Sequence, residues 1–209
     1  MATVEAVAAH FDAEPADAVH AQAATVEGLP GVVVIEHEGR RRVGNMTWGF
    51  PRIDREMRER GDPPGRIGLV ADLTNAMWNK TVVEPRFRCL IAISHFANPD
   101  GIEGEKTRTW FSVKNQPIIA WAGFWRNLAD VGPVYAGMTM TANEAVMPTN
   151  DRMPALLDTH DYERWLHGSI SDVIGFQFRA PFHADRMVVE QTTARWRSDG
   201  LPSTQLGLL

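Results

Sequence analysis

The stretch from Leu69 to Pro99 constrains the fold of this chain more than any other part of it. It holds two short apolar runs, and each run ends in polar residues, at 74–75 and at 94–98. Strands that end in this way deliver polar side chains to the rim of a cleft. We therefore expect two strands that form the floor of a site, with Trp78 and Lys80 exposed between them.

The remaining chain alternates β-branched runs with scattered helical segments. Strands are predicted over 31–37, 41–50, 107–113, 118–125, 134–141 and 186–192. The first two strands form a hairpin through Glu38-Gly39, Pro51 ends the second strand, and residues 107–113 and 118–125 form another hairpin. Helices are predicted over 3–11 with Thr3 as the N-cap, over 53–60, and over 161–166 before Gly168. Hairpins with helices scattered between them indicate an α+β fold.

Length and composition indicate one domain over residues 1–209. No apolar run is long enough to span a bilayer, and the N-terminal residues lack a signal-peptide pattern. Cys89 is the single cysteine, which excludes an internal disulfide, and its place inside an apolar run predicts a buried structural thiol. These features predict a cytoplasmic protein.

Positive charge is concentrated in one part of an acidic chain. Residues 40–88 contain eleven Lys or Arg and six Asp or Glu, which gives +5, while the whole chain has a net charge of -5. The remainder therefore carries -10. Such a segment can attract phosphate locally, although a solvated basic surface explains the same pattern.

Known catalytic and metal-binding motifs are absent from the sequence. The seven histidines form no His-x-His or His-x-x-x-His pair, so no metal site is predicted. There is no G-x-S-x-G elbow, Walker loop or Rossmann glycine run, and no cofactor is predicted. Trp48, which lies in the basic segment before Gly49, is the best candidate for a base-stacking surface.

Six short motifs in a fixed order resemble the SOS response-associated peptidase (SRAP) family. They are Thr47-Trp48-Gly49-Phe50-Pro51, Asn75-Ala76, Arg88-Cys89-Leu90, Ala122-Gly123-Phe124-Trp125, Thr141-Ala142-Asn143 and Asp151-Arg152-Met153-Pro154. The correspondence runs from about residue 4 to about residue 190 and leaves 191–209 as a C-terminal tail. The resemblance implies a strongly curved, barrel-like mixed β-sheet flanked by helices, with a cleft for single-stranded DNA. Family members shield abasic sites through a covalent cross-link and release their own initiator methionine.

The family chemistry uses four groups, of which this sequence retains one. The asparagine of the Asn-Ala motif is Asn75, whereas Ala2 stands in place of the family's N-terminal cysteine. Asn98 occupies the position of the family glutamate, and Asn150 occupies that of the family histidine. Asparagine forms hydrogen bonds but does not titrate in the useful range, so neither residue can serve as a general acid or base. Met77 replaces the arginine that usually follows Asn-Ala, which removes a phosphate contact.

We therefore expect a SRAP-like protein that binds single-stranded or abasic-site DNA without catalysis, in the context of DNA damage and the SOS response. The expected DNA contacts are Trp48, Arg40, Arg41, Lys80 and Arg86. One alternative is an active cross-linking enzyme with self-processing peptidase activity, whose true Met-Cys start is missing from this sequence. Another is a cleft that has been reused as a protein-interaction or small-ligand module.

Overall fold

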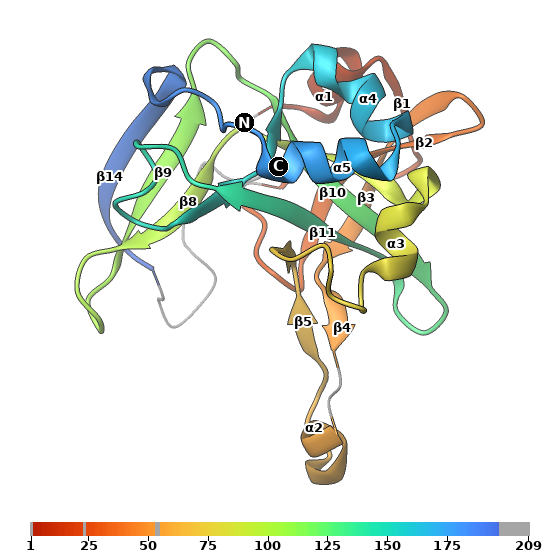
Figure 1. Ribbon diagram of the computed structural model, residues 1–209, viewed down its shortest axis with the longest axis horizontal. Helices are drawn as coiled ribbons and strands as arrows, with labels where there is room; N and C mark the ends of the chain where they lie inside the picture. Colours follow the sequence, from red (N-terminus) through yellow and green to blue (C-terminus); the bar gives the residue numbers. More distant parts are fainter. Residues whose placement is uncertain (1, 23, 53–54, 197–209) are drawn as a thin grey trace.

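A nine-stranded mixed sheet organises the computed structural model, which describes residues 2–22, 24–52 and 55–196 (Figure 1). Its strands are β1 (Ala13–Pro15), β2 (Pro30–His37), β3 (Arg40–Trp48), β6 (Leu69–Val70), β7 (Arg88–Ile93), β10 (Ile119–Leu128), β11 (Gly132–Thr141), β12 (Arg152–Pro154) and β13 (Leu156–Leu157).

The sheet curves until two strands that are distant in sequence meet. Strands β3, β2, β7, β10 and β11 are successive neighbours, and β11 also pairs with β3. This last contact is parallel and consists of two residue pairs, Val134 with Thr47 and Tyr135 with Trp48. Because the closing contact is so short, the sheet is strongly curved without being a regular barrel. The predicted α+β class and curved mixed sheet are thus confirmed.

Two smaller units extend from this sheet. One is a three-stranded sheet in the order β14 (Met187–Arg195), β9 (Thr107–Val113) and β8 (Phe96–Asp100). The other is an arm in which β4 (Phe50–Arg52) pairs with β5 (Gly65–Ile67), with α2 (Arg55–Arg60) at its tip. In Figure 1 this arm points away from the rest of the molecule, and α2 has no buried residue.

Short helices cover the curved sheet. They are α1 (Val4–Phe11), α3 (Asn79–Val83), α4 (Tyr162–His167) and α5 (Ile170–Phe178), with 3-10 turns at Pro85–Phe87, Thr159–Asp161 and Ala184–Arg186. Thr3 caps α1 by accepting a hydrogen bond from the Ala6 amide at 3.2 Å, as predicted. The helix expected at 161–166 is α4, with Gly168 as its C-cap. None of the described helices is long and apolar enough to cross a membrane.

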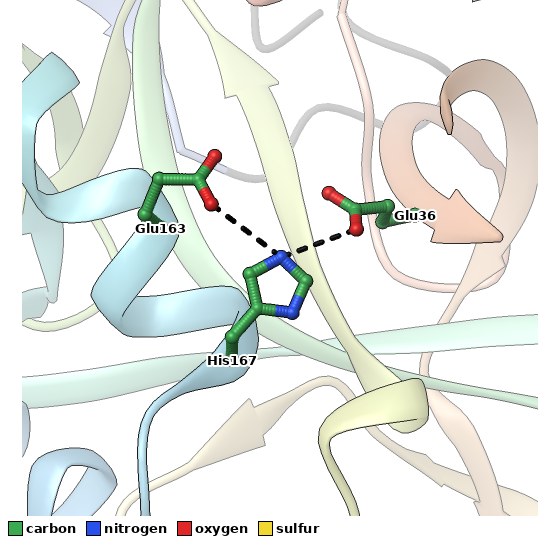
Figure 2. A group of neighbouring side chains, drawn as sticks. All are labelled: Glu36, Glu163 and His167. Atoms are coloured by element: carbon green, nitrogen blue, oxygen red, sulfur yellow. Dashed lines mark ion pairs between the residues drawn. The ribbon is translucent and has the colours of Figure 1, made fainter. Parts of the chain in front are cut away.

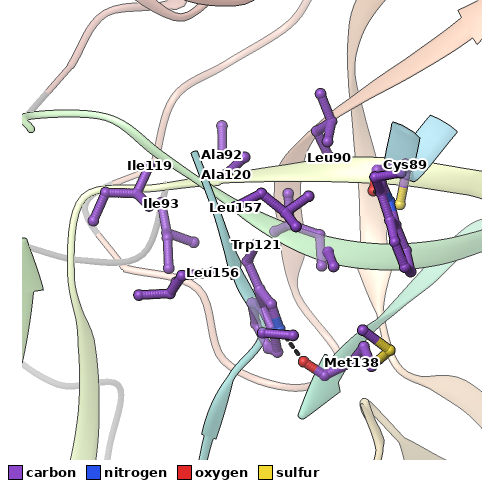
Figure 3. Close-up of a cluster of buried hydrophobic side chains, with 14 of the residues drawn as sticks. Cys89, Leu90, Ala92, Ile93, Ile119, Ala120, Trp121, Met138, Leu156 and Leu157 are labelled. Atoms are coloured by element: carbon purple, nitrogen blue, oxygen red, sulfur yellow. Dashed lines mark hydrogen bonds between the residues drawn. The ribbon is translucent and has the colours of Figure 1, made fainter. Parts of the chain in front are cut away.

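The core lies inside the curve of the sheet, and β7 is buried along its whole length. Figure 3 shows part of this core, where the Trp121 indole donates a hydrogen bond of 2.6 Å to the Met138 carbonyl. Gly137 permits this approach, because a Cβ there would overlap the Trp121 ring. Cys89 has no exposed surface, and burial raises the pKa of its thiol well above the usual range. The prediction of a buried structural thiol is therefore confirmed.

One predicted strand pairing is wrong, although both strands exist. Strand β9 pairs with β8 and β14, whereas β10 pairs with β7, β11 and β13, so 107–113 and 118–125 do not form a hairpin. Strand β10 instead aligns Ile119 to Phe124 with the buried strand β7. Partner choice depends on side-chain packing between distant segments, which adjacency along the chain does not determine.

The environments predicted for Trp78 and Pro51 are also wrong. Trp78 is only 3% exposed, and its ring meets Phe50 edge to face at 5.1 Å between centroids. The polar residues near Trp78 in the sequence predicted an exposed side chain, but the indole at the start of α3 points inward. Pro51 does not end the strand, since it lies within β4 and faces Arg66 of β5. Gly49, with φ of +103°, separates β3 from β4, and a two-stranded ribbon accommodates proline because its edges are free.

The last strand is longer than the sequence indicates. Strand β14 extends to Arg195, five residues into the segment 191–209 that was assigned to a tail. Residues 197–209 of that predicted tail lie outside the described residues.

Candidate functional site

A cavity of about 240 Å³ lies between the curved sheet and the three-stranded sheet. Its walls come from β3, β6, β8, β10, β11 and β12, together with Asn150 before β12 and the residue that follows β14. The lining residues are Trp48, Leu69, Phe96, Ala97, Asn98, Pro99, Trp121, Thr139, Asn150, Arg152, Met153, Pro154 and Trp196. Three residues selected from the sequence, namely Trp48, Asn98 and Asn150, therefore share one cavity.

Trp48 is half-buried in the wall of this cavity and is held rigidly. Its indole donates a hydrogen bond of 2.8 Å to the Gly68 carbonyl. The ring stacks on Tyr135 with centroids 6.4 Å apart and meets Trp121 edge to face at 5.9 Å. A fixed aromatic ring of this kind can stack with a planar ligand at a small cost in conformational entropy.

Asn98 and Asn150 reach the cavity from different elements. Asn98 lies on β8, is 9% exposed, and donates a hydrogen bond of 3.1 Å to the hydroxyl of Thr149. Asn150 precedes β12, and its side-chain oxygen accepts a hydrogen bond of 3.0 Å from the Arg152 amide. Among the described residues, the Asn98 side-chain oxygen and the Asn150 side-chain nitrogen form no hydrogen bond, so both atoms can bind a ligand.

Arg152 supplies the positive charge of the cavity. Its guanidinium donates to the Thr139 hydroxyl at 3.2 and 3.0 Å, to the Thr139 carbonyl at 2.7 Å and to the Ala71 carbonyl at 3.2 Å. No carboxylate forms an ion pair with it among the described residues. A fixed cation without an acidic partner favours an anionic ligand. Sequence reasoning missed this role, although Arg152 follows Asn150 by two residues.

Asn75 does not line the cavity. It lies exposed in the turn after β6, where its side-chain oxygen accepts a hydrogen bond of 3.0 Å from the Met77 amide. The same turn begins beside Ala71, whose carbonyl accepts hydrogen bonds from Arg152 and from Gln177. Two of the three predicted amides thus converge, while the third lies on a loop anchored to the cavity wall.

The predicted basic contacts are spread over other surfaces. Arg40 and Arg41 occupy the opposite end of β3 from Trp48, roughly 25 Å away along the strand. Arg40 pairs with Glu14 at 3.7 Å, and Arg86 pairs with Glu84 at 2.6 Å. Lys80 is exposed on α3. None of these four residues lines the cavity.

Arg41 belongs to an ion-pair cluster that joins β2, β3 and α4. Its guanidinium contacts Glu36 at 3.8 Å and forms a short ion pair with Glu163. Figure 2 shows His167 between the same two carboxylates, at 3.1 Å from Glu36 and 3.6 Å from Glu163. Two carboxylates and a histidine could hold a metal ion, but here both carboxylates already form ion pairs with Arg41. The arrangement favours a structural ion-pair network.

A second acidic group, around Asp158, is also paired with arginines. Arg186 binds the Asp158 carboxylate through two hydrogen bonds of 2.6 and 3.0 Å, and Arg179 contacts Asp161 at 2.9 Å. Hydrogen bonding from Arg186 lowers the pKa of Asp158 below its usual range. These contacts connect the 3-10 turn at 159–161 to the C-terminal end of α5 and to the 3-10 turn at 184–186.

Comparisons with solved structures support the fold. A protein from Bordetella bronchiseptica is 19% identical, has a TM-score of 0.73, and the match covers 90% of this chain and 94% of that chain. A protein from Bacteroides thetaiotaomicron is 17% identical, with a TM-score of 0.69 and coverage of 91% and 88%. A phage-related protein from Bordetella bronchiseptica is 14% identical, with a TM-score of 0.58 and coverage of 85% of both chains. At these identities the similarity shows a common fold.

A comparison with protein families identifies the chain itself. No curated protein matches it. The model of the SOS response associated peptidase (SRAP) family, however, matches residues 1–195, which include every motif quoted from the sequence and all of β14. The chain therefore belongs to the SOS response-associated peptidase family.

Proposed function

We propose that this protein binds single-stranded or abasic-site DNA non-covalently. Membership in the SRAP family supports a function associated with DNA damage. The observation that carries the finer proposal is the shared cavity of Trp48, Asn98, Asn150 and Arg152. It combines an aromatic ring, two amides and an unpaired cation, which are the groups that proteins use to hold single strands.

Each part of the cavity has a separate role in this proposal. Arg152 binds a backbone phosphate, because its guanidinium is fixed by Thr139 and Ala71 and has no acidic partner among the described residues. Trp48 provides the stacking surface. Asn75, on the loop that starts at Ala71, contacts the DNA strand beside the cavity. Arg40, Arg41, Lys80 and Arg86 remain predicted contacts outside it.

In this proposal the protein does not catalyse the family's cross-linking reaction, because Asn98 and Asn150 stand at the positions of the family glutamate and histidine. Proton transfer at a sugar aldehyde needs a group that gains and loses a proton near neutral pH, and an amide does not. This argument holds wherever the natural chain begins, since Asn98 and Asn150 are internal.

The active-enzyme alternative makes an opposite prediction that a denaturing gel can test. When the protein is incubated with an oligonucleotide that carries an abasic site, we expect no band of reduced mobility after denaturation. A stable shifted band would show that covalent chemistry survives without the family's glutamate and histidine, and would overturn the non-catalytic part of the proposal.

Fluorescence anisotropy with a labelled single-stranded oligonucleotide at low salt tests the binding itself. We expect Arg152→Gln to weaken binding about tenfold, in line with the loss of one charge-assisted hydrogen bond. Arg42→Gln is the matched control, because it removes the same charge from an exposed residue near the end of β3 that is distant from Trp48. Absence of binding, or equal effects of the two substitutions, would contradict the proposed site. Binding of a protein or a neutral small molecule instead would favour the reused-cleft alternative.

A further inference from the structure

Trp196 is a cavity residue that the sequence motifs do not include. It directly follows β14 and lines the same cavity as Trp48 and Trp121. Its backbone amide donates a hydrogen bond of 2.8 Å to the Lys106 carbonyl. Its carbonyl accepts one of 3.0 Å from Arg108, which is only 7% exposed. The Arg108 guanidinium also lies 5.9 Å from the centre of the indole ring. The position of Trp196 is therefore fixed by a buried side chain.

The cavity walls combine aromatic surfaces with unused amide atoms. Three indoles line it, from Trp48, Trp121 and Trp196. The Asn98 side-chain oxygen can accept a hydrogen bond and the Asn150 side-chain nitrogen can donate one, since neither has a partner among the described residues. Aromatic faces with one donor and one acceptor match a nucleobase, which has flat faces and a polar edge. A sugar without a base has no flat aromatic face to stack.

The size and the surroundings of the cavity agree with this occupant. The cavity volume of about 240 Å³ is smaller than that of cavities for drug-sized ligands. It suits one nucleobase. Trp196 also lines a second hollow, whose lining includes Lys106, Arg195 and Glu103. Lys106 and Arg195 are exposed and form no ion pair among the described residues. They can contact the phosphates next to a base held against Trp196.

We propose that the cavity accepts an intact, unpaired base of a DNA strand, stacked against Trp196, in preference to a sugar without a base. This inference rests on the proposed single-strand binding and adds the chemical class that the cavity selects. It also gives the amides at positions 98 and 150 a positive role, as groups that bind the edge of the base.

The test compares two short strands built from a non-reactive tetrahydrofuran analogue of the abasic sugar. One strand carries a single central adenine and the other carries no base, so that no other base can fill the cavity. Binding is measured by competition against a labelled oligonucleotide. We expect the strand with adenine to bind about tenfold more tightly, as for one stacked base.

Substitutions at Trp196 then assign the preference to this residue. Trp196→Ala should lose most of the preference for the adenine strand, although Trp48 and Trp121 remain in the cavity, and Trp196→Phe should restore most of the preference. Phe178→Ala is the control, because Phe178 is 77% exposed on α5 and does not line the cavity. Circular dichroism checks that each variant is folded.

The outcomes separate this inference from the function on which it rests. Equal binding of both strands that still depends on Arg152 would overturn the base preference alone. An undiminished preference for adenine in Trp196→Ala would also overturn it. If neither these strands nor an ordinary single-stranded oligonucleotide bound, the proposed function would fail and the inference would fail with it.

Discussion

Asn98 illustrates how one atom can decide between binding and chemistry. Its carboxamide has the shape of an aspartate side chain but carries no charge, and it lies in the same cavity as Arg152. A neutral side chain there leaves the positive charge of Arg152 available to a phosphate. A carboxylate would compete with that phosphate for the same cation.

Asn98→Asp should therefore weaken oligonucleotide binding at pH 7, by about fivefold to tenfold for roughly 1 kcal/mol of added repulsion at an intermediate dielectric. Asn127→Asp adds the same charge at an exposed position on β10 away from the cavity, and should leave affinity almost unchanged. Anisotropy titrations of both variants would measure the difference. Equal losses in the two variants would mean that net charge, and not the cavity, controls binding.

The sequence predicted some, but not all, of the residues that line the cavity. The sequence motifs predict Trp48, Asn98 and Asn150 as site residues, and all three line one cavity. Trp196 could not be predicted as a site residue, because it belongs to no motif. Its position depends on hydrogen bonds with Arg108 of β9 and with Lys106, which precedes β9. Arg152 appeared only as part of a motif. Its role depends on the absence of an ion pair with a carboxylate among the described residues, and a single sequence does not show which charges pair.

Strands β10 and β11 both contribute to the cavity wall, and the Trp121 ring of β10 packs directly on Gly137 of β11. Gly137 on β11 lies against the ring of Trp121 on β10, and a side chain there would overlap that ring. The Trp121 indole also lines the cavity, so both the packing of β10 on β11 and the shape of the cavity depend on Trp121.

Gly137→Ala should destabilise the protein by about 1–3 kcal/mol, which is typical of overpacking in a core, and should also weaken oligonucleotide binding as Trp121 shifts. Gly44→Ala is a matched control in β3, because a Cβ at Gly44 meets nothing within 4 Å. Urea unfolding of both variants measures the stability. A Gly137→Ala protein as stable as Gly44→Ala would mean that Trp121 relocates without cost.

Helix α5 depends on a capping box that is sensitive to pH. The Ser169 hydroxyl accepts a hydrogen bond from the Asp172 amide, and the Asp172 carboxylate accepts hydrogen bonds from Ser169 and Arg164. Hydrogen bonds from Arg164 and Ser169 lower the pKa of Asp172 from 3.8 to about 2. Because the folded pKa is depressed, this stabilisation is fully present above pH 4 and is lost as the pH falls through 2.

Asp172→Asn should therefore have a lower Tm than the natural protein at pH 7, and the difference should disappear towards pH 2. Thermal unfolding followed by circular dichroism between pH 2 and pH 7 measures it. A Tm difference that stays constant over this range would show that the carboxylate charge contributes nothing to the cap.

Most elements could be predicted, and so could the hairpin of β2 with β3, whereas the partners of the other strands could not. Strands such as 31–37 and 134–141 are marked by β-branched runs, and they correspond to β2 and β11. The predicted hairpin of 107–113 with 118–125 is wrong because β9 pairs with β8 and β14, while β10 pairs with β7 and β11. The curved sheet itself was implied by family resemblance, since the contact of β3 with β11 consists of only two residue pairs.

Over the whole molecule, charge limits how DNA can bind. The chain has a net charge of -5, and the arginines at positions 40, 41 and 86 contact carboxylates. Three of the basic contacts predicted from the sequence are therefore already paired with carboxylates. We expect binding to depend mainly on the cavity.

We expect the logarithm of the binding constant to fall with the logarithm of salt concentration with a slope of about -0.7 to -2, as for one to three phosphate contacts on a single strand. Anisotropy titrations at several salt concentrations measure this slope. A slope steeper than about -4 would reveal an extended basic surface, including the predicted contacts Arg40, Lys80 and Arg86, and would place most of the binding outside the cavity.

The arm formed by β4, α2 and β5 extends away from the helices and sheets, and its terminal helix buries no side chain (Figure 1). Nothing in the core relies on that helix, so the loop at Gly61, whose φ is +71°, should tolerate an inserted peptide. An epitope or a fluorescent label placed there would leave the curved sheet intact. The protein thus offers its own attachment point for surface capture and single-molecule imaging.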